Sequence, residues 1–467
     1  MSWNNKTLSE ALGINIEANA QYGAIQYNST DVKDGDIFIA MRADALPTIK
    51  GTKDSHIYVK DALDRGAVLA IVEHEIDGVD NSKLLIVSDS FEALRKMASY
   101  KRQKSKAKFI AITGSAGKTS TKEAMHTALS HFGKTFANPG TFNNELGARL
   151  TLASIPLDAE YVVMEVGMNH AGEIRSIIND IAPDYVMINN ILPVHLENFE
   201  SIKGIADAKL EILEGLKPGG TALFNADSEF YGYACDKAKA LGVKEIYGFG
   251  EELGNGILLE YHFENGASKA RVSIEGRDFV FTTAIAGKHR ILNLVGVLTM
   301  CFTMELDPKE ASRAFALSVS PKGRGEVHQV NIYGYKCTII DDSYNASPVA
   351  TKESLMHLKS LDSPKKIVIL GNMMELGPNE IEYHKGLLPH VIDAGVSKLY
   401  TVGNLMKYLY DIAPDDIKGV HYENYLKLED DLSSIIDGDM MILLKGSKSQ
   451  KLSYIVEKLL SKEVQEK

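Results

Sequence analysis

The chain has few cysteines and no pattern that would pair them. Its 467 residues include three cysteines, Cys235, Cys301 and Cys337, and none of them forms a C-x-x-C motif. Disulfide-stabilised folds and cysteine-rich zinc sites need paired or closely spaced thiols. Neither is predicted, and a cytoplasmic location, where thiols stay reduced, is the expectation.

Long apolar runs and an excess of positive charge are also missing. The longest uncharged apolar stretch lies between Arg290 and Glu305. It is shorter than the roughly 20 residues that a bilayer span requires, so we predict a buried helix. The N-terminus has no basic segment before an apolar core, so no secretory signal and no stable membrane anchoring are expected. A formal net charge of −11 disfavours a nucleic-acid partner.

Apolar runs alternate with helical patterns along most of the chain, which is typical of βαβ units and parallel sheets. We predict an α/β fold with three domains: a small α/β N-terminal domain (1–86), a central P-loop-type parallel-sheet ATPase domain (87–320) and a Rossmann-like C-terminal α/β domain (321–467). Residues 258–287 alternate with period two and are predicted to form antiparallel strands at a sheet edge. The predicted parallel strands include FIAIT, YVVMEVG, YVMINNI and TALFNAD, then KCTIID, KKIVILG, KLYTVG and DMMILLKGS.

The segment TGSAGKTST has the composition of a phosphate-binding loop between a strand and a helix. Its glycines allow a tight turn whose N–H groups hold phosphate oxygens at a helix N-terminus. Lys118 would reach the outer phosphates of ATP, and the Thr119 hydroxyl would bind Mg²⁺. Ile112 stands where the general pattern has another glycine, and a plain Gly-Ser turn is the alternative. The predicted loop is Thr113, Gly114, Ser115, Ala116, Gly117, Lys118 and Thr119.

Two polar side chains follow apolar strands beside this loop. Glu165 interrupts YVVMEVG, and burying a carboxylate is costly unless it is paired or metal-bound. It therefore suits a Mg²⁺ ligand, with an N-cap or an ion pair as the alternative. His195 follows YVMINNI at the edge where open α/β sheets carry their sites, although a structural histidine explains the position equally well.

Lys209 lies in the apolar seam of the predicted helix SIKGIADAKLEILEGL. The ammonium could snorkel to the edge or touch a phosphate. Alternatively, the neutral amine that burial favours could react with CO₂ to give a carbamate. If His195 marks a second Mg²⁺, a lysine cation about 4 Å away would be repelled by ~8 kcal/mol at an effective dielectric of ~20. A carbamate on Lys209 would be negatively charged, so it would attract Mg²⁺ instead of repelling it, and it would supply oxygen ligands.

Nine segments in a fixed order resemble the Mur ligase family, and the resemblance covers nearly the whole chain. The family's own loop, T-G-x-x-G-K-T, lacks the glycine that is missing at Ile112. The segments are TGSAGKTSTKE, NNELGARLTL, EVGMNHAGEI, PVHLENFESIKGIADAKLEI, AGKHRILN, GRGEVHQV, IIDDSYNASP, GNMMELG and LLKGSKS.

The resemblance implies a role for each matching residue. Lys118 and Thr119 would serve the ATP phosphates and the first Mg²⁺, with Glu165 as a further ligand, and His195 with carbamylated Lys209 would hold a second Mg²⁺. The N-terminal domain would bind the uridine diphosphate of the substrate, and the C-terminal domain would bind the amine substrate and close over ATP. Three further contacts are implied: Asn293 with adenine, Arg324 with the phosphates and Asp342 with the ribose. Asn345 and the loop from Lys445 to Ser447 would lie near the peptide or the incoming dipeptide.

Some positions depart from the family pattern. Arg290 stands where many members have Asn in G-x-H-N-x-x-N, and Asn372 replaces the frequent Asp of G-D-M-x-E-L-G. In the N-terminal domain, YNSTDV replaces D-S-R-x-V and KDSH replaces D-G-H. These last changes bear on uridine binding more than on the chemistry.

The resemblance implies an ATP-dependent amide ligase that works through an acyl phosphate. The segments DDSYNASP and M-x-E-L-G favour the member that adds D-alanyl-D-alanine to UDP-N-acetylmuramoyl-tripeptide, and a monomer is expected. Three alternatives remain: a sister ligase or folylpolyglutamate synthase with another acceptor, a P-loop ATPase that acts as a switch or motor, and a binding protein without turnover.

Overall fold

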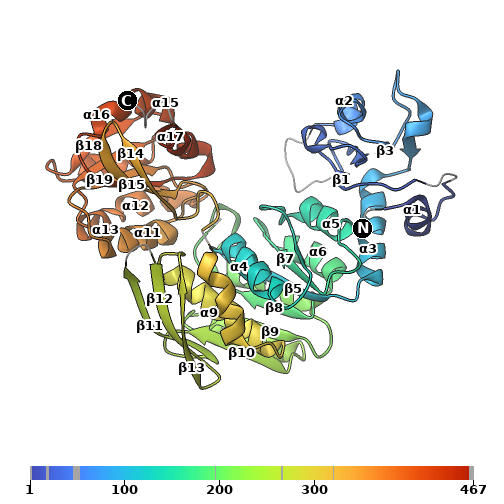
Figure 1. The fold of residues 1–467 in the computed structure, drawn as a ribbon, viewed down its shortest axis with the longest axis horizontal. Helices are drawn as coiled ribbons and strands as arrows, with labels where there is room; N and C mark the ends of the chain where they lie inside the picture. Colours follow the sequence, from blue (N-terminus) through green and yellow to red (C-terminus); the bar gives the residue numbers. More distant parts are fainter. Residues whose placement is uncertain are drawn as a thin grey trace.

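The computed structural model describes residues 3–16, 20–45, 53–194, 196–264, 267–318 and 320–461. Three sheets follow one another along the chain, as Figure 1 shows, and each is flanked by helices. The predicted three-part α/β fold is therefore confirmed. The predicted boundaries near residues 86 and 320 fall between consecutive sheets, but their positions stay predictions.

The N-terminal sheet has four parallel strands in the order β1-β2-β3-β4. The first segment of the chain is nevertheless anchored to the central domain, because the Trp3 indole donates to the carbonyl of Ala153 at 2.9 Å. Helix α3 contacts both α1 and helix α5 (Glu145–Ala153) of the central domain. The elements are α1 (Asn5–Leu12), β1 (Ile25–Gln26), β2 (Ile37–Ile39), α2 (Val59–Asp64), β3 (Leu69–Val72), β4 (Leu84–Ile86) and α3 (Ser90–Lys104).

The central sheet has nine strands in the order β13-β12-β11-β10-β9-β8-β5-β7-β6. Strands β11, β12 and β13 pair antiparallel at one edge, as predicted. The strands are β5 (Lys108–Thr113), β6 (Thr135–Ala137), β7 (Tyr161–Glu165), β8 (Tyr185–Ile188), β9 (Thr221–Asn225), β10 (Glu245–Gly250), β11 (Gly256–Glu264), β12 (Ala267–Ile274) and β13 (Arg277–Thr283).

Helices cover both faces of this sheet. Alternate residues of β5 enter two separate cores: Phe109 and Ala111 pack on one side, and Ile110 and Ile112 pack on the side of α4 and α9. The predicted buried helix near residue 297 is α9, and none of the helices in the described parts of the chain is long and apolar enough to cross a membrane. The helices are α4 (Lys118–Ser130), α5 (Glu145–Ala153), α6 (Glu173–Ile181), α7 (Ile202–Leu210), α8 (Tyr231–Ala240), α9 (Lys288–Thr303) and α10 (Pro308–Arg313).

The C-terminal sheet has the order β14-β15-β19-β16-β17-β18, parallel except for the β14–β15 hairpin. Its strands are β14 (Glu326–Ile332), β15 (Tyr335–Asp342), β16 (Lys366–Gly371), β17 (Lys398–Val402), β18 (Lys418–Tyr422) and β19 (Met440–Lys445). Its helices are α11 (Pro348–Ser360), α12 (Glu380–Lys385), α13 (Leu388–Asp393), α14 (Met406–Ile412), α15 (Tyr425–Asp430), α16 (Leu432–Ile435) and α17 (Leu452–Leu459).

Candidate active site

The predicted phosphate loop connects β5 to α4. Gly117 caps the helix in the left-handed region at φ 75°, and a Cβ there would lie 2.7 Å from Asn293 Nδ2. Glycine is therefore required both by the turn and by the close approach of α9. The Lys118 ammonium donates to the Gly114 carbonyl at 2.9 Å, folded over its own loop. The structure thus brings Asn293 against the phosphate loop.

Two residues that follow β8 brace the loop from outside. Asn190 accepts a hydrogen bond from the Ala116 N–H at 2.8 Å and donates to the Ala116 carbonyl at 3.1 Å. The Ser115 hydroxyl donates to the Leu192 carbonyl at 3.0 Å and accepts from the Leu192 N–H at 2.9 Å. These contacts preform the loop. Sequence reasoning missed Asn190, although a polar pair directly after an apolar strand could have indicated it.

Three adjacent parallel strands end in buried polar atoms that lack a hydrogen-bond partner among the described residues. These atoms are Thr113 Oγ1 on β5, Glu165 Oε2 on β7 and Asn189 Oδ1 just after β8. The register places them at one sheet edge, because Ile112 pairs with Glu165 and Thr113 pairs with Ile188. Leaving such atoms unpaired costs about 1–3 kcal/mol each. This edge is therefore suited to a bound polar group or cation.

The oxygen atoms at this edge fit Mg²⁺. Glu165 is 1% exposed, and among the described residues only its Oε1 is engaged, by Asn143 Nδ2 at 2.6 Å. Thr119 is buried in the first turn of α4. A carboxylate oxygen and a hydroxyl beside a phosphate loop are hard ligands of the kind that Mg²⁺ selects. The metal-binding roles of Glu165 and Thr119 stay predictions.

Lys209 is 1% exposed on α7, and its ammonium has no hydrogen bond or ion pair with the described residues. Burial lowers the pKa of Lys209 well below its ordinary value, and the nearby charge of Lys118 lowers it further. Burial also lowers the pKa of Lys118, which Glu165 opposes and Arg324 reinforces. Lys118, Glu165, Lys209 and Arg324 therefore share one electrostatic environment. His195 lies outside the described residues.

A buried ionic cluster surrounds Asp342 in the C-terminal domain. Its Oδ2 accepts from Lys445 Nζ at 2.8 Å and from the Ser354 hydroxyl at 2.5 Å, and its Oδ1 accepts from Arg290 at 3.3 Å. Burial alone would raise the pKa of Asp342, but Lys445 and Arg290 hold it well below its usual range. Arg290 belongs to α9, so this departure from the family pattern joins two domains.

Arg324 lies on the short Gly323–Gly325 turn before β14. Its guanidinium lies over the Tyr344 ring at 4.1 Å, and the Tyr344 hydroxyl lies 3.1 Å from Thr141 Oγ1 in the central domain. Arg324 therefore faces the central domain from a fixed aromatic support.

The predicted substrate residues lie on neighbouring strand ends. The Asn345 carbonyl accepts from Lys445 Nζ at 3.1 Å, and the Ser447 hydroxyl accepts from the Met374 N–H at 3.1 Å. Asn345 is exposed, whereas Lys445 and Ser447 are buried. The structure brings these residues together, and their contact with substrate stays a prediction.

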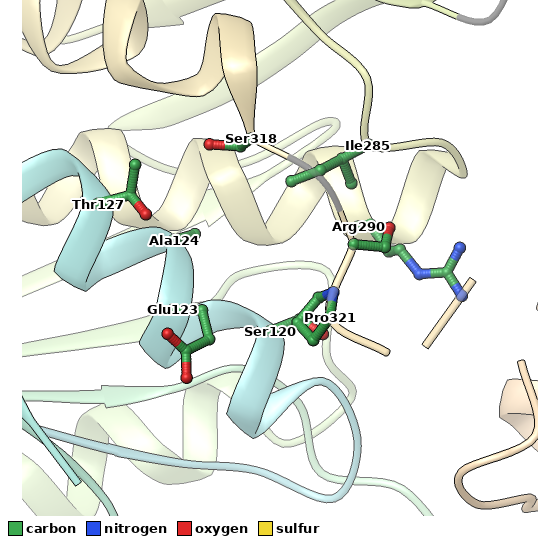
Figure 2. Close-up of a pocket in the computed structure, with 9 residues that line it drawn as sticks. Ser120, Glu123, Ala124, Thr127, Ile285, Arg290, Ser318 and Pro321 are labelled. Carbon is green, nitrogen blue, oxygen red and sulfur yellow. The ribbon is translucent and has the colours of Figure 1, made fainter. Parts of the chain in front are cut away.

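A hollow lies where α4, the start of α9 and the interdomain linker meet, as shown in Figure 2. The Arg290 guanidinium points away from α4 there, toward the C-terminal domain. The hollow follows α4 from its first to its third turn and adjoins the first turn of α9, so it is a candidate for the nucleoside part of ATP. Its lining residues are Ser120, Glu123, Ala124, Thr127, Ile285, Arg290, Ser318, Ser320 and Pro321.

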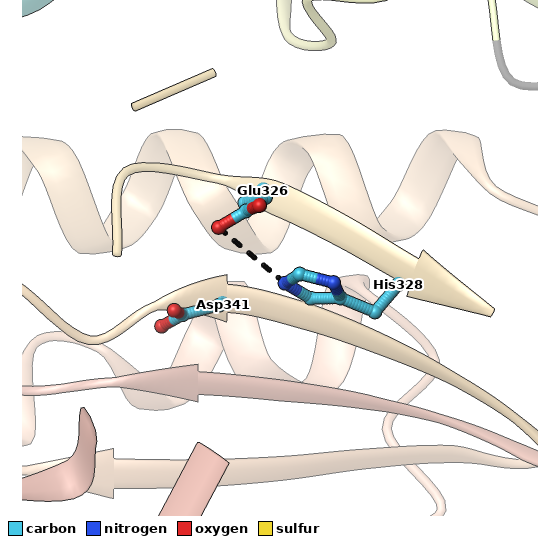
Figure 3. A group of neighbouring side chains, drawn as sticks. All are labelled: Glu326, His328 and Asp341. Carbon is cyan, nitrogen blue, oxygen red and sulfur yellow. Dashed lines mark ion pairs between the residues drawn. The ribbon is translucent and has the colours of Figure 1, made fainter. Parts of the chain in front are cut away.

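A second polar group lies on the β14–β15 hairpin. Figure 3 shows Glu326 and His328 on one strand facing Asp341 on its neighbour, with ligand atoms within 4.8 Å of one another. The His328 imidazole lies 3.4 Å from the Glu326 carboxylate, and Asp341 accepts two hydrogen bonds from Ser343. Ser343 therefore accounts for the position of Asp341, whereas the buried His328 Nε2 makes no hydrogen bond with the residues that the structure describes.

Replacing Lys445 by methionine should destabilise the C-terminal domain. The change leaves the buried Asp342 with fewer partners, which costs about 3–5 kcal/mol of unfolding free energy. The pKa of folded Asp342 is depressed, so the stabilisation is present above the unfolded pKa of about 4 and is lost as the pH falls below it. Urea unfolding of wild type and variant at neutral and acidic pH measures both effects.

The control is Lys359→Met, which breaks the exposed 2.7 Å ion pair with Asp393 on the same domain. It should cost less than about 1 kcal/mol. Equal losses in the two variants would contradict a special role for the buried pair.

Comparisons with known proteins extend along nearly the whole chain. A family model described as the Mur ligase middle domain matches residues 112–301, and another described as the Mur ligase, glutamate ligase domain matches residues 323–448. The UDP-N-acetylmuramoyl-tripeptide–D-alanyl-D-alanine ligase of Rickettsia prowazekii is 39% identical over 98% of this chain and 99% of its own length. The enzyme of the same name from Bacillus subtilis is 28% identical over 88% and 89%.

Solved structures of MurF proteins have the same fold as this chain. A crystal structure of MurF from Acinetobacter baumannii superposes with a TM-score of 0.84 at 25% identity, covering 98% of this chain and 99% of that one. MurF from Thermotoga maritima in complex with ADP has the same fold, with a TM-score of 0.77 at 24% identity over 93% and 96% of the two chains.

Proposed function

The chain belongs to the Mur ligase family, and we propose that it joins D-alanyl-D-alanine to UDP-N-acetylmuramoyl-tripeptide with cleavage of ATP to ADP and phosphate. The observation that carries this proposal is the meeting of a preformed phosphate loop with the half-engaged carboxylate of Glu165 and the buried amine of Lys209. A simple phosphate-binding turn needs neither of the last two.

The reaction makes an amide from a carboxylate, which is too poor an electrophile to react directly with an amine. An oxygen of the tripeptide carboxylate attacks the γ-phosphorus of ATP, the bond to the β-phosphate oxygen breaks, and ADP leaves. The dipeptide amine then attacks the acyl phosphate carbon, loses a proton, and the tetrahedral intermediate expels phosphate. Lys118 and Arg324 would balance negative charge on the transferred group, and their shared electrostatic environment supports this role.

Magnesium would be held by Glu165 and Thr119, with a second ion served by His195 and a carbamate on Lys209. Bound there, the ions would neutralise phosphate charge and orient the transferred group. Lys209 would form the carbamate when its neutral amine adds to CO₂ and releases one proton. Burial and the charge of Lys118 favour that neutral amine.

The remaining contacts follow the same assignment. Asn293 would contact adenine, and Asp342 would contact the ribose. Asn345, Lys445 and Ser447 would lie near the peptide or the dipeptide. The domain of residues 1–86 would hold the uridine diphosphate. We place the reaction in the cytoplasm, where it would complete the precursor of cell-wall peptidoglycan, and we expect a monomer.

One assay separates this function from its alternatives. Phosphate release is measured with ATP and UDP-N-acetylmuramoyl-tripeptide, with and without D-alanyl-D-alanine, and then with single amino acids or glutamate as acceptors. We expect release to depend on the dipeptide. Release without any acceptor would indicate an ATPase, release with another acceptor would indicate a sister ligase or a folylpolyglutamate synthase, and no release would indicate a binding protein.

A further inference from the structure

The loop between β6 and α5, residues 138–144, lies directly against Glu165. Asn138 is 1% exposed; its Oδ1 accepts from the Glu165 N–H at 2.8 Å and its Nδ2 donates to the Glu165 carbonyl at 3.2 Å. One side chain thus satisfies both backbone groups of Glu165. The loop fixes the main chain from which the carboxylate projects.

The same loop holds the carboxylate itself. Asn143 Nδ2 donates to Glu165 Oε1 at 2.6 Å, and the Asn143 carbonyl accepts from the Gly167 N–H at 2.8 Å. A Cβ at Gly167 would lie 2.9 Å from Asn143 Cγ, so the glycine leaves room for the amide. Both the position and the direction of the Asn143 side chain are therefore set by the chain after β7.

A buried lysine on α4 is hydrogen-bonded to this loop. Lys122 is fully buried on α4, and its ammonium donates to the carbonyls of Asn138 at 2.6 Å and Gly140 at 3.0 Å, with Glu123 as its ion-pair partner at 2.7 Å. An ammonium without water is costly unless such groups surround it. Lys122 therefore ties the loop to the helix that follows the phosphate loop.

We propose that Asn143 is a positioning residue for Glu165, and that Lys122 holds the loop that presents it. By engaging Oε1, the amide fixes the carboxylate rotamer and leaves Oε2, buried and without a partner among the described residues, as the ligand atom. Partners that orient a ligand in this way commonly determine metal affinity. The inference rests on the proposed function, because it takes Glu165 as a Mg²⁺ ligand.

The test is the affinity of the full chain for Mn²⁺, used as a paramagnetic substitute for Mg²⁺ and titrated by electron paramagnetic resonance in the presence of ADP. Asn143→Ala should weaken Mn²⁺ binding about 10-fold to 100-fold. Asn143→Ser, whose hydroxyl is too short to reach Glu165, should behave alike. Lys122→Met should weaken binding in the same direction, and added Mg²⁺ should restore part of the lost ligase rate in each variant.

The matched control is Asn255→Ala. Asn255 Nδ2 makes an equally short 2.6 Å bond to a glutamate, Glu275, on the antiparallel edge of the same sheet. Its loss should leave Mn²⁺ affinity unchanged. Thermal unfolding of each variant shows whether it is folded, so a loss of affinity is assigned to positioning only where the fold is intact.

Glu165→Ala separates failure of the inference from failure of the function. If Glu165→Ala loses Mn²⁺ while folded Asn143→Ala and Asn143→Ser bind it within about twofold of wild type, the positioning role is wrong and the ligand assignment stands. If Glu165→Ala also binds Mn²⁺ with wild-type affinity, Glu165 is not a metal ligand, and the positioning role of Asn143 is wrong as well. The dipeptide dependence of phosphate release judges the proposed function independently of both results.

Discussion

A Lys118→Met variant is expected to release phosphate about 10³-fold more slowly than wild type in the complete reaction, since a preorganised charge at the transferred group is removed. Within the described parts of the chain the ammonium donates to the Gly114 carbonyl, a contact that phosphate oxygens can replace. Methionine fills a similar volume but carries no charge. The loss should therefore lie mainly in kcat, with a smaller change in KM for ATP, measured by steady-state phosphate release.

Two further variants test whether the loss of activity is specific to the Lys118 ammonium. Lys118→Arg retains a cation but not the compact ammonium that fits inside the loop, so it should recover little activity. Lys134→Met removes an exposed lysine that pairs with Asp158, and it should leave turnover unchanged. A Lys118→Met enzyme within tenfold of wild type would contradict the phosphate role.

The fold could be predicted because its signals are periodic and local. Parallel strands buried on both faces require uninterrupted apolar runs, and YVVMEVG or TALFNAD show them directly. The antiparallel edge was visible as alternation with period two. Anchoring of the first residues to the central domain was not visible, because the bond from Trp3 to Ala153 joins positions 150 apart.

The residues of the candidate site likewise include some that the sequence pattern reveals and others that only the fold reveals. Glu165 and Lys209 could be found because a charge in an apolar pattern stands out. Asn143 and Lys122 could not, since a polar residue in a loop or a lysine within a helix is ordinary in sequence. Their importance arises from contacts that only the fold creates.

Arg290 shows how a departure from a family pattern can acquire a structural meaning. From sequence it was a missing asparagine beside adenine. In the structure its guanidinium pairs with Asp342, 52 positions away and in another domain. It also fills the space beside Gly325, where a Cβ would lie 2.2 Å from Arg290 Nη1. Arg290 therefore makes an interdomain contact at this position.

Replacing Lys209 by alanine is expected to reduce ligase turnover by about 10²-fold to 10³-fold, the range for loss of one electrostatic group in a closed site. Lys209 is buried, has no partner among the described residues, and is repelled by Lys118. A plain cation would be unfavourable here, whereas a carbamate would supply negative oxygens. Wild-type enzyme freed of CO₂ should lose activity and recover with bicarbonate, as measured by phosphate release.

The choice of variants decides between the two charges that Lys209 could carry. If it acts as a cation toward phosphate, Lys209→Arg should keep much of the activity and bicarbonate should have no effect. If it acts as a carbamate, Lys209→Arg should be as impaired as Lys209→Ala, because guanidinium does not react with CO₂ under these conditions. Short carboxylic acids should then restore part of the activity of Lys209→Ala by filling the vacated space with an anion. ¹³C-bicarbonate gives a reading independent of activity, since a carbamate carbon should be detected in the wild type and be absent from both variants.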